Sequence, residues 1–400
     1  MVTPQTLVLP SGHEIVLTSA VPSFQEGNFF MALLFDAKRL KNGGLEAIKK
    51  AGIHCSDQEG KNRVPAQMFV PDRKPPWTLA LHCPWPQAEA KKGAYDILLD
   101  SAHGQKIGTV HAAYKPGLLR RYGTTACINN VWNGVEPTLK LVPPWMEFQL
   151  LHGVDHFLVY TQHGTDVSVL DLYEPYIKAG LATRVHFNVS AKLSTGYQTQ
   201  PWMANDCLYR AKGHTRWLMP TVDADEYFRL GQNDTKGDYL RTFWDQMAKE
   251  ELVRKNMSVY AITAPRIIFE RKINPKDLDH LDISTAYRYP SSCNLPKFVC
   301  RPDMVNTTWI HWPSSFMPEG FENYQLDMER GFFAHYRDSP TQPTMAKTKK
   351  TGRKPDVLDE TLLADIPAVH MALERRFRKP WAEVAAKFTK GSDEAILAAS

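Results

Sequence analysis

The hydrophobic and polar positions divide the chain into two parts with different textures. Up to about residue 122, short apolar stretches such as residues 95–99 and 106–110 are broken by Pro and Gly and show little helical periodicity. Stretches of this kind are typical of strands joined by turns, so residues 1–122 are predicted to form a smaller β-rich domain. Three aromatic side chains of this part either stack on sugars or belong to its core: Trp77, Trp85 and Tyr95.

From residue 123 onward, strand-like and helix-like segments alternate. Pro143 and Pro144 are expected to open a helix, a position where proline is tolerated, and Gly153 is expected to end it. Short strands that alternate with helices indicate βαβ units and a parallel sheet covered on both faces. The later expected helices cover residues 170–178 and 200–212, and the expected strands cover 157–160, 184–187 and 217–222.

The C-terminal part of the chain has a different composition. Residues 339–356 contain the Pro, Thr and Lys of a mobile basic linker, whose charged side chains are expected to be solvated. Residues 357–400 are predicted to form a C-terminal helical segment. The α/β domain is therefore predicted to span residues 123–338.

The segment "WLMPTVDADEYFRL" (residues 217–230) places Asp223, Asp225 and Glu226 between apolar runs. Burying such carboxylates is costly unless positive charge lies among them. Asp223 and Asp225 follow a predicted interior strand, and open α/β sheets bind ligands at that end of their strands. Hard oxygen ligands there suit a divalent cation that also holds a diphosphate. The alternative is a solvated acidic turn.

Composition and charge limit the classes of function. The 43% of hydrophobic and 23% of charged residues are those of an ordinary globular protein. A net charge of +5 is only mildly basic, so a nucleic-acid partner is not expected. The apolar runs are shorter than the roughly 18 residues of a membrane span, so we expect a soluble chain without a spanning helix or signal peptide.

Cysteines and glycosylation sequons bear on the cellular compartment. Six cysteines lie far apart without a C-x-x-C pair, which argues against a zinc site and leaves disulfides undecided. The Asn-x-Ser/Thr sequons outnumber the roughly one or two expected by chance and favour a secretory lumen. Unused sequons in a cytosolic protein are the alternative. The sequons begin at Asn188, Asn233, Asn256 and Asn306.

Five segments of the α/β part occur in an order and spacing that resemble a known family. They are "EFQLLHGVDHFLVY", "QPWMANDCLYR", "WLMPTVDADEYF", "KFVCRPDMVNTTWIHW" and "FFAHYRD". With them, residues 124–338 resemble family 92 glycosyltransferases, which include plant pectic galactan synthases and animal galactosyltransferases. The resemblance implies a GT-A-type, Rossmann-like fold. It also implies an inverting, metal-dependent enzyme that transfers galactose from UDP-galactose to a hydroxyl of a glycan acceptor.

The resemblance also implies roles for individual residues. Asp223 and Asp225 match the D-x-D pair that binds Mn²⁺, or another divalent cation, together with the diphosphate of the nucleotide sugar. His311 matches a histidine that completes the metal site, since neutral imidazole is a common ligand of such ions; otherwise it is a core histidine between two tryptophans. Gln200 and Asp206 match positions that hold ribose or donor hydroxyls, or else they cap or buttress their helix.

The catalytic base and the acceptor are not identified by the sequence. An inverting transfer needs a carboxylate that takes the proton of the acceptor hydroxyl. The stretch that contains the candidates does not fit the family pattern on the acceptor side. Family members act in the Golgi lumen behind an N-terminal anchor, so we expect a truncated ectodomain, an incomplete gene model or a soluble variant. The candidate bases are Glu270, Asp277, Asp279 and Asp282.

Two other functions are compatible with a D-x-D pair at a strand end. A haloacid-dehalogenase-type phosphotransferase uses one with Mg²⁺, but it needs a small or hydroxyl residue soon afterwards, where Glu226 and Tyr227 stand here. A catalytically inactive carbohydrate-binding protein on a glycosyltransferase fold is the second alternative, because a fold does not imply a function. Hydrolysis of a nucleotide sugar in the presence of Mn²⁺ separates the enzyme from the binding protein.

Overall fold

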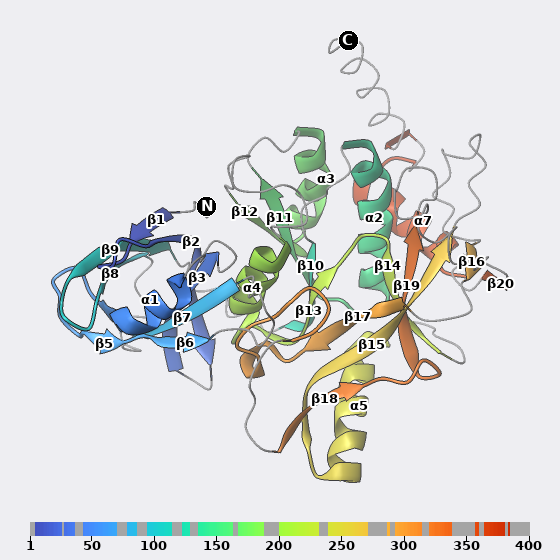
Figure 1. The fold of residues 1–400 in the computed structure, drawn as a ribbon. Helices are drawn as coiled ribbons and strands as arrows, with labels where there is room; N and C mark the ends of the chain where they lie inside the picture. Colours follow the sequence, from blue (N-terminus) through green and yellow to red (C-terminus); the bar gives the residue numbers. More distant parts are fainter. Residues whose placement is uncertain are drawn as a thin grey trace, which may run out of the picture.

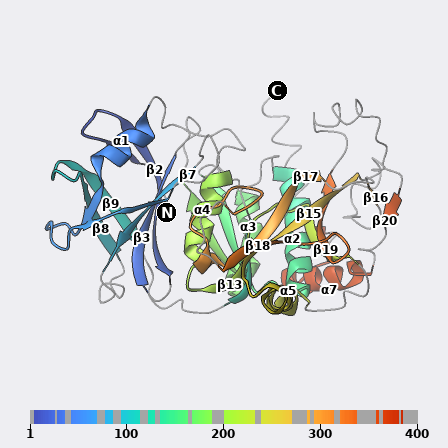
Figure 2. The same ribbon diagram turned by 60° about the horizontal axis from the view of Figure 1, so that its bottom comes forward.

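The structure of the 400-residue chain is a computed structural model. Figure 1 shows a β-rich N-terminal part beside a larger α/β part, and helix α4 (Gln200–Ala211) lies where the two meet in Figures 1 and 2. The residues that the structure describes are 5–25, 28–36, 43–69, 78–85, 94–113, 122–128, 135–162, 167–187, 200–231, 239–270, 286–288, 293–313, 320–337, 357–359, 364–380 and 383–384.

Two antiparallel sheets form the N-terminal part, as its short apolar stretches predict. Apolar side chains of both sheets belong to one core, and the Cys55–Cys83 disulfide joins a strand of each sheet. One sheet, of order β1-β2-β3-β7-β6, contains β1 (Gln5–Val8), β2 (Glu14–Gln25), β3 (Asn28–Asp36), β6 (Gln67–Phe69) and β7 (Thr78–Pro84). The other, of order β5-β4-β8-β9, contains β4 (His54–Ser56), β5 (Val64–Pro65), β8 (Ala94–Asp100) and β9 (Lys106–Ala113), and helix α1 spans Gly44–Ala51.

Strand β3 is apolar from Phe29 to Phe35 because both of its faces are buried. Side chains alternate across a strand. Phe29 and Phe35 belong to the core between the two sheets, whereas Phe30 and Leu34 belong to a second cluster with Tyr209 of α4. The N-terminal part is therefore packed against the α/β part through α4.

Tyr95 belongs to the core of the N-terminal part. Its side chain is buried, and its ring lies 5.7 Å from that of Phe29 and 6.4 Å from that of Trp85, measured between centroids. The core interpretation thus holds for Tyr95 and Trp85, and a sugar-stacking role of Tyr95 is wrong. Trp77 lies outside the described residues.

Four parallel strands confirm the expected βαβ units. They have the order β12-β11-β10-β13, and the Cys127–Cys207 disulfide links β10 to α4. Gly180 and Gly213, which follow α3 and α4, have φ angles of 72° and 74°, a conformation that glycine adopts without steric cost. The elements are β10 (Tyr122–Ile128), α2 (Val135–Leu151), β11 (His156–Gln162), α3 (Val167–Lys178), β12 (Ala182–Phe187) and β13 (Thr215–Val222).

Helix α2 begins earlier than expected. It starts at Val135, so Pro143 and Pro144 lie inside the helix and do not open it. Each proline removes one backbone N–H donor from the helix. The turn that follows buries Trp145 and Phe148 in the main core, and this packing overrides the local preference of proline.

The rest of the large sheet corrects the expectation of a wholly parallel sheet. Strand β17 runs antiparallel to β13 and β15 runs antiparallel to β17, so the sheet is mixed. Strands β18 and β19 pair in parallel with β15, and β14 pairs with β19. The elements are β14 (Glu226–Leu230), β15 (Ser258–Glu270), β16 (Ala286–Arg288), β17 (Cys293–Cys300), the 3₁₀ helix η4 (Pro302–Met304), β18 (Phe321–Gln325) and β19 (Gly331–Arg337).

The last described elements correct the C-terminal prediction. Residues 357–400 were expected to be helical, but the segment starts with strand β20 (Val357–Asp359), which pairs with β16 far away in sequence. Helix α7 (Ile366–Phe377) follows and packs on α2 and α3. The predicted linker at 339–356 lies outside the described residues.

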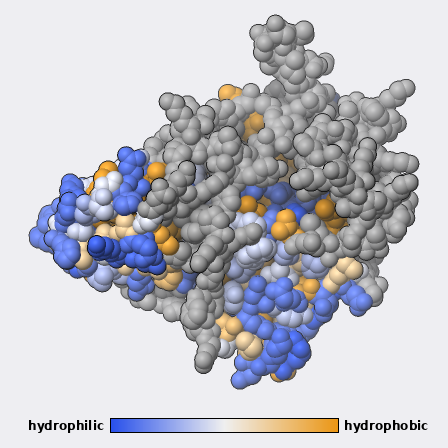
Figure 3. Space-filling model, in the orientation of Figure 1, coloured by the Kyte–Doolittle hydropathy of each residue, from blue (hydrophilic) through white to orange (hydrophobic). Residues whose placement is uncertain are grey.

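Helix α5 (Leu240–Lys255) is amphipathic in its packing. It buries Trp244 and Met247 in the main core, and Figure 3 shows a mostly hydrophilic surface over this helix. Within the described ranges, none of the helices combines the length and the apolar character that a membrane span requires.

Candidate functional site

Three carboxylates lie together at the carboxyl end of β13, as the sequence predicts. The strand ends at Val222, and the turn that follows is closed by the Glu226 N–H, which donates to the Asp223 carbonyl oxygen over 2.9 Å. The Asp223 N–H in turn donates to Glu226 Oε2 over 3.1 Å. The Asp225 carbonyl oxygen accepts from the Tyr336 N–H over 2.9 Å, which fixes the turn to β19.

Glu226 is fully buried and lies among the side chains of three basic residues. Lys297 Nζ lies 2.9 Å from Glu226 Oε2, and Arg266 Nη1 lies 3.0 Å from Oε1. His335 Nδ1 lies 3.5 Å from the same Oε1 atom. Burial acts to raise the pKa of Glu226, but Lys297, His335 and Arg266 hold this pKa well below its usual value. Lys297 and Arg266 therefore supply part of the positive charge that the buried carboxylates require.

Lys297 connects both ends of the acidic turn. Its side chain is 1% exposed, and Nζ donates to the Thr221 carbonyl oxygen and to Asp223 Oδ2, the latter over 3.2 Å. Burial acts to lower the pKa of Lys297, but Asp223 and Glu226 raise it above its usual value. Sequence reasoning missed this residue. The available signal was a single lysine inside the apolar strand "CNLPKFVC".

Asp223 and Asp225 differ from Glu226 because they are partly exposed. Their side chains are 34% and 23% exposed. Asp223 uses Oδ2 for Lys297, and Asp225 uses Oδ2 for His335 Nε2, which lies 3.1 Å away. Among the described residues, Oδ1 of each aspartate has no hydrogen-bond partner. Desolvation raises the pKa of Asp223, and Lys297 opposes this shift. One carboxylate oxygen of each aspartate is therefore open to a ligand.

His311 lies next to this turn. Its Nδ1 donates to the Pro296 carbonyl oxygen over 2.8 Å, because a carbonyl can only accept, and Nε2 is consequently the nitrogen with a lone pair. Burial, with Lys297 and Arg266 nearby, lowers the pKa of His311 to about 3, so the ring is neutral at physiological pH. The ring packs against Trp309, with centroids 5.0 Å apart.

The three predicted metal ligands are not preassembled as a group. In the part of the chain that the structure describes, no three His, Cys, Asp or Glu side chains are placed to hold a metal ion together. Thr221 Oγ1 donates to the Ile310 carbonyl oxygen over 2.6 Å, so the segment that carries His311 is nevertheless attached to the strand that precedes Asp223.

Asp206 does not face the carboxylate site, which corrects its predicted role in donor binding. The residue is fully buried, and its carboxylate accepts hydrogen bonds from Ser19, Tyr160 and Arg210. These contacts leave no room for a ligand, so Asp206 buttresses α4 against β2 and β11. Gln200, the first residue of α4, is also buried.

The predicted base candidates fall largely outside what the structure describes. Glu270 is the last residue of β15, and its backbone pairs with Arg337 and Tyr287. The Glu270 side chain lies outside the described part of the chain, as do Asp277, Asp279 and Asp282.

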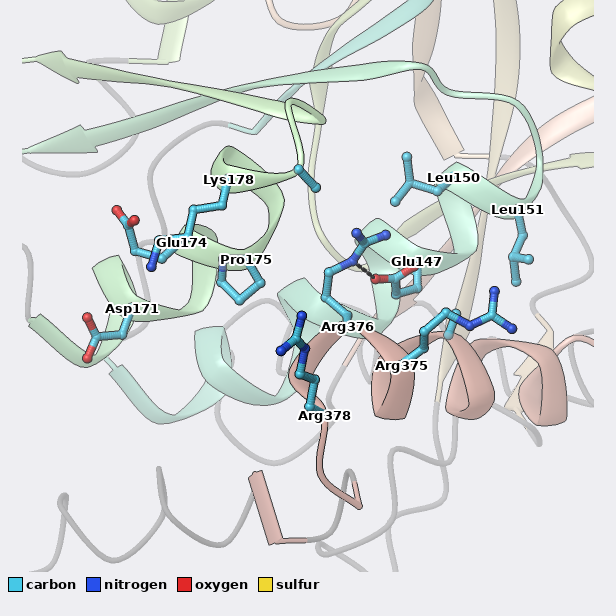
Figure 4. Close-up of a pocket in the computed structure, with 12 residues that line it drawn as sticks. Glu147, Leu150, Leu151, Asp171, Glu174, Pro175, Lys178, Arg375, Arg376 and Arg378 are labelled. Atoms are coloured by element: carbon cyan, nitrogen blue, oxygen red, sulfur yellow. Dashed lines mark hydrogen bonds and ion pairs between the residues drawn. The ribbon is translucent and has the colours of Figure 1, made fainter.

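A separate cavity of about 970 Å³ lies between α2, α3 and α7. Figure 4 shows Arg376 reaching across it to Glu147, whose Oε1 lies 2.9 Å from Arg376 Nε. Its lining comes from the last turns of these helices and includes Asp171, Lys178 and Arg375. None of the predicted site residues lines this cavity, so it is distinct from the carboxylate site.

Comparison with known proteins adds three findings. The model of glycosyltransferase family 92 matches residues 122–382, which include the whole acidic turn and His311. Galactan beta-1,4-galactosyltransferase GALS3 of Arabidopsis thaliana is 20% identical over 227 residues, covering 56% of this chain and 43% of the relative. Galactan beta-1,4-galactosyltransferase GALS1 of the same plant is 29% identical over 101 residues, covering 25% of this chain and 20% of the relative. The matches span less than half of either relative.

Proposed function

We propose that this chain, which belongs to glycosyltransferase family 92, is a metal-dependent inverting enzyme that transfers galactose from UDP-galactose to a hydroxyl of a glycan acceptor. The family supports the reaction class, and the names of both relatives support galactose as the transferred sugar. The observation that carries the proposal is the pair of partly exposed aspartates, Asp223 and Asp225, directly after the interior strand β13.

The donor atoms at this site fit a divalent cation. Oδ1 of Asp223 and Oδ1 of Asp225 are hard oxygen ligands, and Nε2 of the neutral His311 ring is a nitrogen ligand that manganese-like ions accept. A bound cation would neutralise the charge that develops on the departing nucleoside diphosphate. Because few protein ligands suffice for a cation that also binds phosphates, the absence of a preassembled trio among the described residues is compatible with this role.

The buried cations hold the acidic turn in position before any ligand arrives. Lys297 and Arg266 are fixed against Glu226, so the turn does not have to reorganise when the donor binds. The acceptor hydroxyl attacks from the face opposite the departing diphosphate and passes its proton to a carboxylate. The candidates for that base are the four side chains outside the described residues.

We also assign the chain to the GT-A fold type and to the Golgi lumen. The four parallel strands, with the acidic pair at the end of the last one, agree with a GT-A arrangement. The disulfides Cys55–Cys83 and Cys127–Cys207 agree with an oxidising compartment. Asn256, one of the sequon asparagines, is exposed at the end of α5.

A panel of nucleotide sugars tests this function. The full chain is incubated with Mn²⁺ and each donor, without an acceptor, and donor hydrolysis is measured. We expect turnover of UDP-galactose above that of UDP-glucose and of guanosine-diphosphate sugars, with loss of the activity on chelation and in Asp225→Ala. Equal or better turnover of another donor would remove the galactose assignment. Glycan binding without hydrolysis of any donor would favour the carbohydrate-binding alternative.

A further inference from the structure

The segment that carries His311 is a stiff turn. Thr308 forms an isolated β-bridge with Pro313, and the Trp309 N–H donates to the Trp312 carbonyl oxygen over 3.0 Å. The Thr308 hydroxyl donates to the Trp309 carbonyl oxygen over 2.8 Å. Residues 308–313, here called the His311 turn, are thus closed at their base, and a shift of Thr308 moves the imidazole with it.

Asn205 of α4 holds this base through both of its side-chain atoms. Its Nδ2 donates to the Thr308 carbonyl oxygen over 2.8 Å, and its Oδ1 accepts from the Thr308 N–H over 2.9 Å. The side chain is fully buried, so water does not compete for these bonds. Two bonds from one planar amide fix both the position and the orientation of the Thr308 peptide groups.

A second attachment comes from the strand that precedes the acidic turn. Thr221 Oγ1 donates to the Ile310 carbonyl oxygen over 2.6 Å, and Thr221 lies two residues before Asp223. The His311 turn is therefore fixed on one side to α4 and on the other to the strand end that presents the carboxylates.

Stabilisation of α4 does not by itself explain why Asn205 forms two hydrogen bonds with Thr308. The amide also donates to the Pro201 carbonyl oxygen over 2.7 Å, which is a bond within the helix. That bond would suffice for a helix residue, yet the two others reach a segment 103 positions away in sequence. The neighbouring Asp206 instead contacts Ser19 of the N-terminal part, so the two adjacent residues attach α4 to different segments.

We propose that Asn205 is a positioning residue, with Thr221 as its second attachment, which places Nε2 of His311 for a divalent cation beside Asp223 and Asp225. This inference rests on the proposed function, because it needs the cation site. Neither Asn205 nor Thr221 would touch the cation or the sugar. Each would act on affinity for the cation only through the position of His311.

The test is a double-mutant cycle on cation affinity, read without turnover. Mn²⁺ binding to the full chain is titrated by electron paramagnetic resonance, which counts the free ion. Asn205→Ala should weaken Mn²⁺ binding roughly tenfold, the lower end for a partner that orients a ligand. In a His311→Ala background the same substitution should change the affinity no further, since its effect passes through that ring.

A control variant separates loss of stability from loss of Mn²⁺ affinity, and a second test variant replaces Asn205→Ala if that protein does not fold. Ser23→Ala removes a buried hydrogen bond to the Tyr209 carbonyl oxygen, also on α4, and should lower the melting temperature without altering Mn²⁺ affinity. If Asn205→Ala does not fold, Thr221→Val removes the other attachment with little change of shape and should show the same loss and the same dependence on His311.

Two results would overturn the inference while leaving the proposed function intact. One is a folded Asn205→Ala or Thr221→Val protein that binds Mn²⁺ as the wild type does. The other is a loss that persists in full in the His311→Ala background, which would show an effect that bypasses the ring. A wild-type chain that binds no Mn²⁺ would instead overturn the proposed cation site, and this inference with it.

Discussion

Replacement of Lys297 by methionine tests whether the buried cations hold the acidic turn. Methionine has a similar length and is apolar, so the variant removes the ammonium group and leaves no large cavity. The change leaves Glu226 fully buried and takes the Lys297 contact away from Asp223 and the Thr221 carbonyl oxygen. Removing one partner of a buried ion pair costs about 3–5 kcal/mol, because the remaining charge stays in a medium that solvates it poorly.

The expected loss lies near the lower end of that range. Arg266 Nη1 remains 3.0 Å from Glu226 Oε1 and keeps part of the carboxylate compensated. We therefore expect Lys297→Met to lose about 3 kcal/mol of unfolding free energy. For a domain of the size of the α/β part, this loss lowers the melting temperature by roughly 6–12 °C. Urea denaturation at neutral pH measures the free energy, and differential scanning calorimetry measures the temperature.

Lys255 provides the matched control. It also contacts two carboxylates, those of Glu251 and Glu322, but its side chain is 40% exposed. Lys255→Met should therefore lower the melting temperature much less than Lys297→Met does. A loss below about 1 kcal/mol in Lys297→Met would contradict the argument from burial.

Three further predictions concern the site and its surroundings. Asp225→Ala should abolish transfer and cost about 1 kcal/mol of stability or less, since the side chain is partly exposed; near-normal transfer in chelator-treated buffer would contradict the metal site. His311→Ala should raise the Mn²⁺ concentration for half-maximal rate at least about tenfold, whereas an unchanged titration with about 1–3 kcal/mol of lost stability would make it a packing residue. Burial and Lys212 lower the pKa of His82 to about 3, so the unfolded state alone binds this proton between pH 6.5 and 3 and stability falls as pH falls. Urea denaturation at several pH values gives the slope of the unfolding free energy against pH, and His82→Gln should reduce this slope by up to about 1.4 kcal/mol per pH unit. An unchanged slope would refute the lowered pKa of His82.

The elements that sequence patterns predicted well are those with local signals. Helices α3 and α4 and strands β11 to β13 follow from their apolar spacing and from the glycines that end them. The patterns did not predict that β20 pairs with β16 or that β17 runs antiparallel to β13, because these partners lie far apart in sequence. The start of α2 was wrong because tertiary packing overrides the local signal of two prolines.

The residues of the candidate site also divide into those that a local sequence pattern reveals and those whose contacts only the fold reveals. Asp223 and Asp225 could be found because they follow a strong strand pattern, and the adjacent Glu226 came with them. Their partners Lys297, Arg266 and His335 come from three later strands, and a single charged residue in an apolar strand gives no sign of which carboxylate it meets. For Asp206 the sequence left donor binding and buttressing of α4 open, because its partner Ser19 belongs to the N-terminal part, far away in sequence.

Three acidic residues of one turn have different surroundings, and this difference explains how the turn can be stable and still keep carboxylate oxygens open to a ligand. If both oxygens of all three carboxylates contacted basic side chains, a further cation would find no open oxygen. If none were, the cost of desolvating Glu226 would oppose folding of the turn. Both oxygens of Glu226 contact basic side chains, Oε1 that of Arg266 and Oε2 that of Lys297, whereas Asp223 and Asp225 keep one oxygen each outside such contacts. Glu226 therefore stabilises the turn, and the two aspartates remain available to a ligand.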